Sequence, residues 1–381
     1  METLFDVAQN EIIDENDDST GVEEEDVIGE TITKPFDPTQ IRVDTKIMTI
    51  DLLLNRIRAK SLDLNPDFQR KEGIWTDAAQ SRLIESILIR IPIPAFYMDA
   101  TNEENWLVVD GLQRLTALKR FVINKELKLC GLEFLTYLHG KKYDDLSPNF
   151  QRRIQETQII VYQIAEGTPS NVKFNIFKRI NTGGLPLSAQ EIRHALNQGK
   201  ITKFLIRLAG TNEFKKAHDG SINDKRRTDQ ECVLRFIAYT LVPYTSYSGD
   251  LDGFLNDIMQ QVNSLPDSKI DELEQKFLKA IHTAYNIFDK DAFRKRYNRN
   301  NRRSLINKAL FEAWSVNLGQ LDEEQTQILI ERKETLVDKF IALMNTTDFN
   351  DAVSQGTGDI KKVRIRFSNI ERIIKEVLRH D

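Results

Sequence analysis

The segment from Trp106 to Thr116 constrains the fold more than any other part of the chain. It begins with the apolar run Trp106 to Val109, which is typical of a buried strand, and the strand stops at Asp110-Gly111. A helix is expected to follow at once, because Leu115 and Leu118 recur at helical spacing. A strand that feeds a helix through a glycine predicts a mixed α/β domain.

Further segments extend this α/β (α+β) domain over residues 34–205. Apolar residues at helical spacing predict helices from about Ile47, from Asp77, over 170–180 and over Ser188–Asn197. Short strands are expected at Ala95–Met98 and Gln158–Ile164. Beyond about residue 200 the pattern is almost wholly helical, so an all-α C-terminal domain is expected over 206–381.

Residues 1–33 form an acidic leader with 12 carboxylates and no Lys or Arg. Such a segment buries too little apolar surface to order itself, so a disordered, solvated tail is expected. Without these carboxylates the chain carries 53 basic against 46 acidic residues, a net charge of +7. A second interpretation therefore has the leader competing with an anionic ligand for the basic body.

The composition excludes several classes of protein. Apolar runs fall short of the ~20 residues that span a membrane, and the acidic start is unlike a secretory signal. With only Cys130 and Cys232 there is neither a disulfide framework nor a four-cysteine zinc site. A cytoplasmic protein without a membrane partner is expected.

The turn at Asp110-Gly111, which follows the expected strand Trp106 to Val109, has the chemistry of an anion site. Backbone N–H groups at a helix start favour phosphate, and Gly111 lets a ligand approach the backbone. Arg114 is suited to phosphate oxygens, Asp110 to magnesium or a water, and Gln113 to orienting that water. The alternative is an ordinary strand–turn–helix with a surface arginine.

Two more segments combine an aromatic residue, an arginine and an amide beside a turn. They are Pro66-Asp67-Phe68-Gln69-Arg70 and Phe177-Lys178-Arg179-Ile180-Asn181-Thr182-Gly183-Gly184. This mixture suits a polar pocket for a phosphate and a base or ribose. For Arg70 and Arg179 the alternative is a surface salt bridge, and the aromatic residues are expected in the core.

The order of these motifs resembles the GmrS-type domain, the N-terminal half of the GmrSD modification-dependent restriction systems, in the DUF262 family. The resemblance runs from about Ile41 to Gly199 and rests on motifs in register: P-D-F-Q-R, V-V-D-G-L-Q-R-L-T-A-L, F-K-R-I-N-T-G-G and L-S-A-Q-E-I-R. It implies a ParB/sulfiredoxin-like fold whose strand-to-helix turn binds or hydrolyses a nucleoside triphosphate (NTP).

The family signature D-G-Q-Q-R falls on Asp110, Gly111, Gln113 and Arg114, with Leu112 in place of the first Gln. If that amide positions water or phosphate, hydrolysis is slow or absent while binding survives. The resemblance also implies that the matching F-Q-R and R-I-N-x-G elements supply further pocket members: Gln69, Arg70, Arg179, Asn181 and Gly183.

Many relatives carry a C-terminal nuclease of the His-Asn-His type. The five histidines of this chain show no paired metal-ligand spacing, so nuclease activity of this chain alone is not expected. A nuclease or another effector protein acting in trans remains a candidate partner.

A basic run in the C-terminal half predicts contact with DNA. Residues 294–303 contain one tyrosine, three asparagines and six cationic residues. The cationic residues are Arg294, Lys295, Arg296, Arg299, Arg302 and Arg303. The alternative is a solvated helix end or loop.

The first hypothesis is therefore an NTP-binding and hydrolysing component of a prokaryotic restriction or anti-phage defence system. It binds NTP with Mg²⁺ and couples the nucleotide state to DNA or an effector. The second is a non-catalytic DNA-binding or adaptor protein with a ParB-like recognition module, which Leu112 favours. The third, nuclease activity from the ParB-like domain, lacks a carboxylate-rich metal cluster to support it.

Overall fold

The computed structural model describes residues 21–24, 41–64, 75–180, 187–222, 224, 226–300 and 302–379. Contacts divide the chain into two compact units. Residues 34–196 form the α/β unit, and residues 1–33 with 197–381 form the helical unit. The division falls before α8 (Lys200–Ala209), whereas the expected boundary at residue 205 lies inside that helix.

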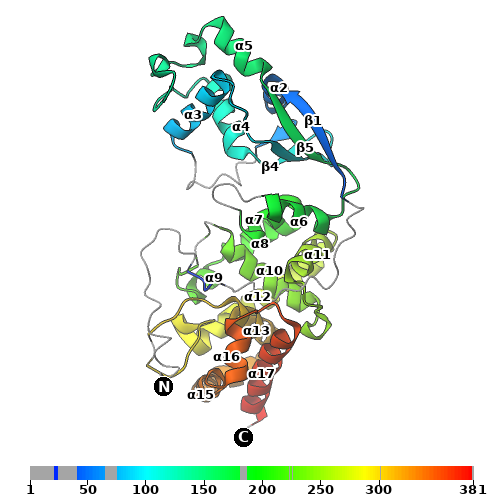
Figure 1. Ribbon diagram of the computed structural model, residues 1–381. Helices are drawn as coiled ribbons and strands as arrows, with labels where there is room; N and C mark the ends of the chain where they lie inside the picture. Colours follow the sequence, from blue (N-terminus) through cyan, green and yellow to red (C-terminus); the bar gives the residue numbers. More distant parts are fainter. Residues whose placement is uncertain are drawn as a thin grey trace. The chain divides into compact units, whose positions relative to one another are not determined.

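The α/β unit is built on a five-stranded mixed sheet (Figure 1). Its strands, in spatial order, are β1 (Val43–Thr49), β5 (Gln158–Ile164), β3 (Phe96–Asp99), β4 (Trp106–Asp110) and β2 (Leu62–Asp63). Pairing is antiparallel between β1 and β5 and between β3 and β4, and parallel in the other two pairs. The sequence did not predict β1, an edge strand whose exposed residues include Ile47.

Helices cover both faces of the sheet because β5 alternates its side chains between two cores. Ile159 and Val161 pack in one core, whereas Ile164 packs in the other. The first core includes residues of α2 (Ile50–Arg58), α3 (Asp77–Leu88), α4 (Leu112–Leu118) and α5 (Pro148–Glu156). The second includes residues of α6 (Ser170–Ile180) and α7 (Ala189–Leu196).

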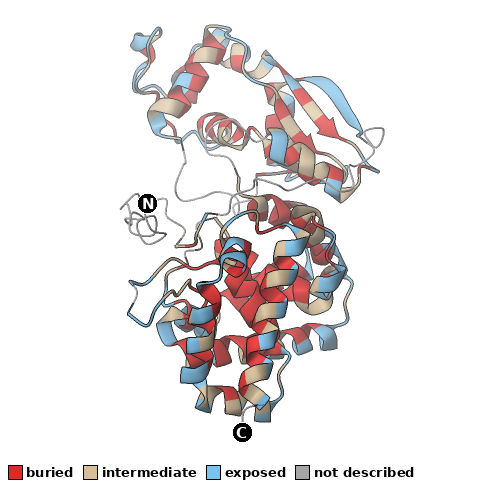
Figure 2. Cartoon of the chain, turned by 60° about the horizontal axis from the view of Figure 1, so that its bottom comes forward, coloured by how far each residue is buried: buried red, intermediate tan, exposed pale blue. Residues whose placement is uncertain are grey.

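The helical unit surrounds α13 (Lys308–Gly319), whose residues from Ala309 onward are all buried (Figure 2). A helix that is buried all round needs neighbours on every side. Its main neighbours are α10 (Thr228–Leu241), α12 (Asp267–Phe288) and α17 (Ile360–Arg379). The unit also contains α8, α9 (Asn212–Ala217), α11 (Leu251–Asn263), α14 (Glu323–Glu331), α15 (Lys333–Met344) and α16 (Thr347–Ser354). The expected mixed α/β region followed by a helical C-terminal part is confirmed.

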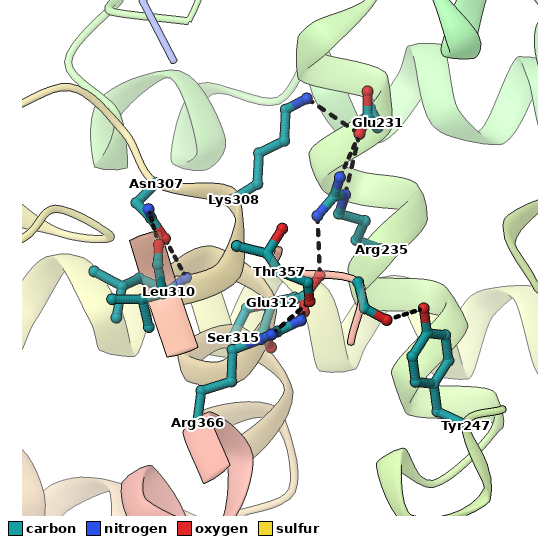
Figure 3. Close-up of polar contacts among 12 residues, drawn as sticks. Glu231, Arg235, Tyr247, Asn307, Lys308, Leu310, Glu312, Ser315, Thr357 and Arg366 are labelled. Carbon is teal, nitrogen blue, oxygen red and sulfur yellow. Dashed lines mark hydrogen bonds and ion pairs between the residues drawn. The ribbon is translucent and has the colours of Figure 1, made fainter. Parts of the chain in front are cut away.

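Buried charges join three of these helices (Figure 3). Glu312 of α13 accepts a hydrogen bond of 2.9 Å from Arg366 Nε of α17 and pairs at 3.4 Å with Arg235 of α10. Arg235 also binds Glu231 at 2.8 Å, and Lys308 binds the same carboxylate at 3.1 Å. Each buried charge is thus paired, so the network holds the three helices in one arrangement.

The leader is not wholly a solvated tail. Val22 is 5 % exposed and packs in the core of the helical unit. Glu23 N donates to Ile306 O at 2.8 Å, and Ile306 N donates to Gly21 O at 3.3 Å. The expected disorder is therefore wrong for Gly21–Glu24, while the rest of the leader lies outside the described residues. No helix in the described part of the chain is long and apolar enough to cross a membrane.

Candidate functional site

The turn between β4 and α4 has the predicted strand–glycine–helix form. Gly111 adopts φ +101°, a left-handed conformation that glycine tolerates without strain. A Cβ at this position would lie 2.4 Å from Phe96 Cδ1, so close packing also requires glycine. Asp110 ends β4 at the rim of this turn, with its side chain 28 % exposed.

Arg114 points into the protein and not toward solvent. The residue is 8 % exposed, and its guanidinium donates to Asp110 Oδ2 at 2.7 Å, to Ala95 O at 3.2 Å and to Pro94 O. It also lies 4.5 Å from the centre of the Phe96 ring. Burial lowers the pKa of Arg114, against the opposing effect of Asp110. The expected phosphate contact of Arg114 is therefore corrected, because its guanidinium already donates to Asp110 and to the two backbone carbonyls that precede β3.

Gln113 of α4 contacts Trp75, which lies on the N-terminal side of α3. Its Oε1 accepts a hydrogen bond of 3.2 Å from the backbone N–H of Trp75, whereas its Nε2 has no hydrogen bond to any described residue. Gln69 and Arg70 lie outside the described residues. Gln113 therefore fixes the backbone at Trp75, and its Nε2 donor is unused by the described residues.

The second flanking motif begins in α6. Arg179 is exposed near the end of this helix, while Asn181 and Gly183 lie outside the described residues. Phe177 packs in the same small core as Val109, the residue before Asp110. The core thus joins the helix that carries Arg179 to the strand that carries Asp110.

The described residues offer limited means of holding a metal. They contain no group of three or more His, Cys, Asp or Glu side chains in a metal-binding arrangement. In the turn itself, residues 110–112, the carboxylate is that of Asp110, which is paired with Arg114. Mg²⁺ commonly takes one or two carboxylates together with phosphate oxygens and water, so a single carboxylate fits a metal that arrives with a triphosphate.

Most cationic side chains of the predicted DNA-binding run, residues 294–303, form contacts within the protein. Arg294 is 4 % exposed and donates to Ser304 O, to Ser221 Oγ at 2.7 Å and to His218 O at 3.3 Å. A nucleic-acid contact by Arg294 is therefore corrected to a structural role, since its donors close the loop that precedes α13.

Four other cations of this run have acidic partners. Lys295 pairs with Glu23, Arg296 with Asp291, Arg299 with Glu334 and Asp338, and Arg303 with Asp219. Arg302 is exposed and forms no ion pair with a described residue. Neighbouring carboxylates thus offset most of the positive charge that supported the DNA prediction.

A groove of about 1060 Å³ lies at the opposite end of the sheet from the β4–α4 turn. Its lining includes Arg42, Lys46, Arg56, Trp106 and the buried Gln163. Sequence reasoning missed this groove, because four separate segments form it and only folding brings them together. The cation of Arg56 lies 3.6 Å from the centre of the Trp106 ring.

Comparison with known families identifies the region that contains these motifs. Residues 50–197 match the GmrSD restriction endonuclease, N-terminal domain. Searches of curated proteins and of solved structures found no match. The matched range extends from the start of α2 to the end of α7 and includes the turn at Gly111. Residues 50–197 of this chain are therefore a GmrSD-type N-terminal domain, which points to a protein of a restriction or defence system.

Proposed function

We propose that this chain is a cytoplasmic, nucleotide-dependent component of a restriction or defence system that acts with DNA or an effector protein. Its GmrSD-type domain, taken as a ParB/sulfiredoxin-like fold, binds a nucleoside triphosphate with Mg²⁺ at the β4–α4 turn. The observation that carries the proposal is the left-handed Gly111 between the rim carboxylate of Asp110 and α4.

Three side chains are assigned to the ligand. Asp110 holds Mg²⁺ or polarises a water. The Nε2 of Gln113, which has no hydrogen bond to a described residue, donates to a phosphate or to the base. Arg179 supplies an exposed positive charge from the end of α6. Arg114 is a positioning residue, because it fixes Asp110 and the backbone at Ala95 that leads into β3.

Binding without hydrolysis is the second candidate, and Leu112 favours it. This residue packs against the core of the α/β unit and offers no amide to orient an attacking water. The chain would then serve as an adaptor whose nucleotide-bound form engages its partner. Phosphate release by wild type and by Asp110→Ala distinguishes hydrolysis from binding alone. Equal background rates in both proteins, together with nucleotide binding by wild type, select the adaptor.

Calorimetry with Mg²⁺ and each of the four NTPs tests the binding site. Asp110→Asn and Arg179→Ala are expected to weaken binding by about ten-fold, because each removes a charge-assisted contact. The matched control is Arg207→Ala, an exposed arginine on α8 of the helical unit. Arg114→Lys is expected to lower the free energy of unfolding by about 2 kcal/mol through the lost fork of hydrogen bonds.

Absence of binding for all four NTPs would refute the proposed site. A large loss of affinity in Arg114→Lys at unchanged stability would instead restore Arg114 as a phosphate ligand.

A further inference from the structure

An ordered loop of the α/β unit, residues 129–141, presents two aromatic side chains to solvent. Its neck is closed by backbone hydrogen bonds from Leu129 N to Lys141 O at 3.0 Å and from Gly140 N to Leu129 O at 2.7 Å. Between these bonds, Phe134 is 68 % exposed and Tyr137 is 66 % exposed. We refer to residues 129–141 as the aromatic loop.

The backbone of the aromatic loop is anchored to α3 by Glu85, which is 3 % exposed. One carboxylate oxygen of Glu85 accepts from Phe134 N and Leu135 N, both at 2.7 Å, and the other accepts from Glu133 N at 3.0 Å. Burial acts to raise the pKa of Glu85, but these three backbone donors outweigh it and the pKa lies below its usual value. One turn earlier on α3, Ser81 Oγ accepts from Cys130 N at 3.0 Å.

The buried carboxylate of Glu85 thus fixes the backbone of a loop whose two aromatic rings, Phe134 and Tyr137, are exposed. Fixing a loop backbone costs conformational entropy, and an aromatic ring gains nothing from water contact. Neither Phe134 nor Tyr137 belongs to a core cluster of the described residues. A loop made rigid before binding lowers the entropy that a partner must offset, which is the expected property of a recognition surface.

The charges at the neck indicate what kind of partner fits. Lys128, Lys141 and Lys142 lie at or beside the two ends of the loop, and none forms an ion pair with a described residue. By contrast, the neighbouring Asp144 is paired with Lys125 at 2.8 Å, and Glu133 is within 3.5 Å of Arg82. The cations at the neck of the aromatic loop are therefore available to contact phosphates.

A loop with exposed aromatic rings and with lysines at its ends has the combination that binds single-stranded nucleic acid, because bases stack on the rings while the lysines contact the backbone. We propose that the aromatic loop is a stacking platform for unpaired bases of single-stranded DNA. A duplex keeps its bases stacked on each other, so it offers no base faces to Phe134 and Tyr137. The inference rests on DNA as a partner but does not depend on the nucleotide site.

Fluorescence anisotropy of the full chain with a labelled oligothymidylate tests this surface. Phe134→Ala and Tyr137→Ala are each expected to weaken binding by about ten-fold, and Tyr137→Phe is expected to retain it, since stacking needs the ring. Ile47→Ala, which truncates an apolar side chain that is 69 % exposed elsewhere in the same unit, is the matched control and leaves affinity unchanged.

Two further variants probe the anchor and the charges. Glu85→Gln keeps the shape of the side chain but weakens its three hydrogen bonds to the loop backbone. It is therefore expected to lower the affinity for the oligothymidylate although both rings remain. Lys128→Ala and Lys141→Ala each reduce the slope of log affinity against log salt by about 0.7. Thermal unfolding midpoints of the Phe134 and Tyr137 variants stay at the wild-type value because both side chains are exposed.

Three results would overturn the inference: no binding of the oligothymidylate by wild type, equal affinity in the ring variants, or preference for the matching duplex. Calorimetry with NTP on the Phe134→Ala/Tyr137→Ala variant keeps the two proposals separate. Retained nucleotide binding with lost DNA binding supports the platform, whereas lost nucleotide binding with retained DNA binding counts against it.

Discussion

Burial sets the protonation state of His218 in the helical unit. This residue follows α9 and is 3 % exposed; its Nδ1 accepts a hydrogen bond of 3.2 Å from Ile222 N, and its ring lies 4.8 Å from that of Phe214. Burial and then the nearby charge of Arg294 lower its pKa from 6.5 to about 4. The folded chain therefore keeps a neutral imidazole where the unfolded chain gains a proton.

The expected consequence is a loss of stability in acid. Below the unfolded pKa of 6.5 the unfolded state binds the proton and the folded state does not, so stability falls until the folded pKa near 4 is reached. Between pH 7 and pH 5 the loss is about 2 kcal/mol. His218→Asn, whose side-chain oxygen accepts the same hydrogen bond, is expected to lack this loss in urea unfolding at the two pH values.

Asp229 has the opposite effect over the same range. Burial raises its pKa to about 6, so the folded state takes up a proton first and gains stability as the pH falls. Because wild type and His218→Asn both contain Asp229, its contribution cancels when their pH dependences are compared. An identical pH dependence for wild type and His218→Asn would show that His218 does not set the acid sensitivity.

At the scale of elements, the short segment Gly21–Glu24 is tied to the loop that leads into α13. Its backbone pairs with Ile306, and Glu23 Oε2 lies 2.8 Å from both Lys295 Nζ and Asn307 Nδ2. The described part of the leader thus neutralises a cation of the basic run. This contact agrees with the interpretation in which the leader competes with an anion, although among the described residues it involves only Lys295.

Gly21→Ala is expected to release this segment. Gly21 has φ +71°, and a Cβ there would lie 1.6 Å from Ser221 O, a backbone atom that cannot move away alone. Exposing Val22 lowers the free energy of unfolding by about 2 kcal/mol. Hydrogen exchange would show lost protection of the Glu23 and Ile306 amides.

Gly220→Ala supplies the control, because Gly220 has a similar φ of +66° with open space around it. Gly220→Ala is expected to introduce the same backbone strain, on the order of 1 kcal/mol, while Gly21–Glu24 stays in place. Equal protection of Glu23 in the two variants would contradict the steric argument.

At the scale of the whole molecule, each hydrophobic core is confined to one unit. The largest cluster contains Val22 and residues from Ile201 to Val377, whereas the other two lie between Met48 and Ile192. The tryptophans divide in the same way, with Trp75 and Trp106 in the α/β unit and Trp314 in the helical unit. A ligand of one unit therefore stabilises that unit's core directly.

Tryptophan fluorescence can report each unit separately. In Trp314→Phe, Mg²⁺ and NTP at about 100 times the dissociation constant are expected to stabilise the α/β unit by about 2.7 kcal/mol. In Trp75→Phe/Trp106→Phe, which retains Trp314, the same ligand is expected to leave the urea midpoint nearly unchanged. Equal shifts in both variants would show that the units unfold together.

Local sequence pattern determined the strand–glycine–helix turn, most helices of the described residues and the family of residues 50–197. Neighbours along the chain decide backbone conformation and apolar periodicity, so short-range signals suffice for these features. The edge strand β1 escaped prediction because its outer residues are exposed, and its partner β5 lies more than a hundred residues away.

Tertiary structure alone decided which charges are free. Arg114 turns inward because the carbonyls of Pro94 and Ala95 lie beside it, and the run from Arg294 to Arg303 is offset by carboxylates from distant segments. The exposure of Phe134 and Tyr137 likewise depends on Glu85, which is about fifty residues earlier in the chain. A side chain's type is written in the sequence, but its availability to a ligand depends on partners that only folding brings within hydrogen-bonding distance.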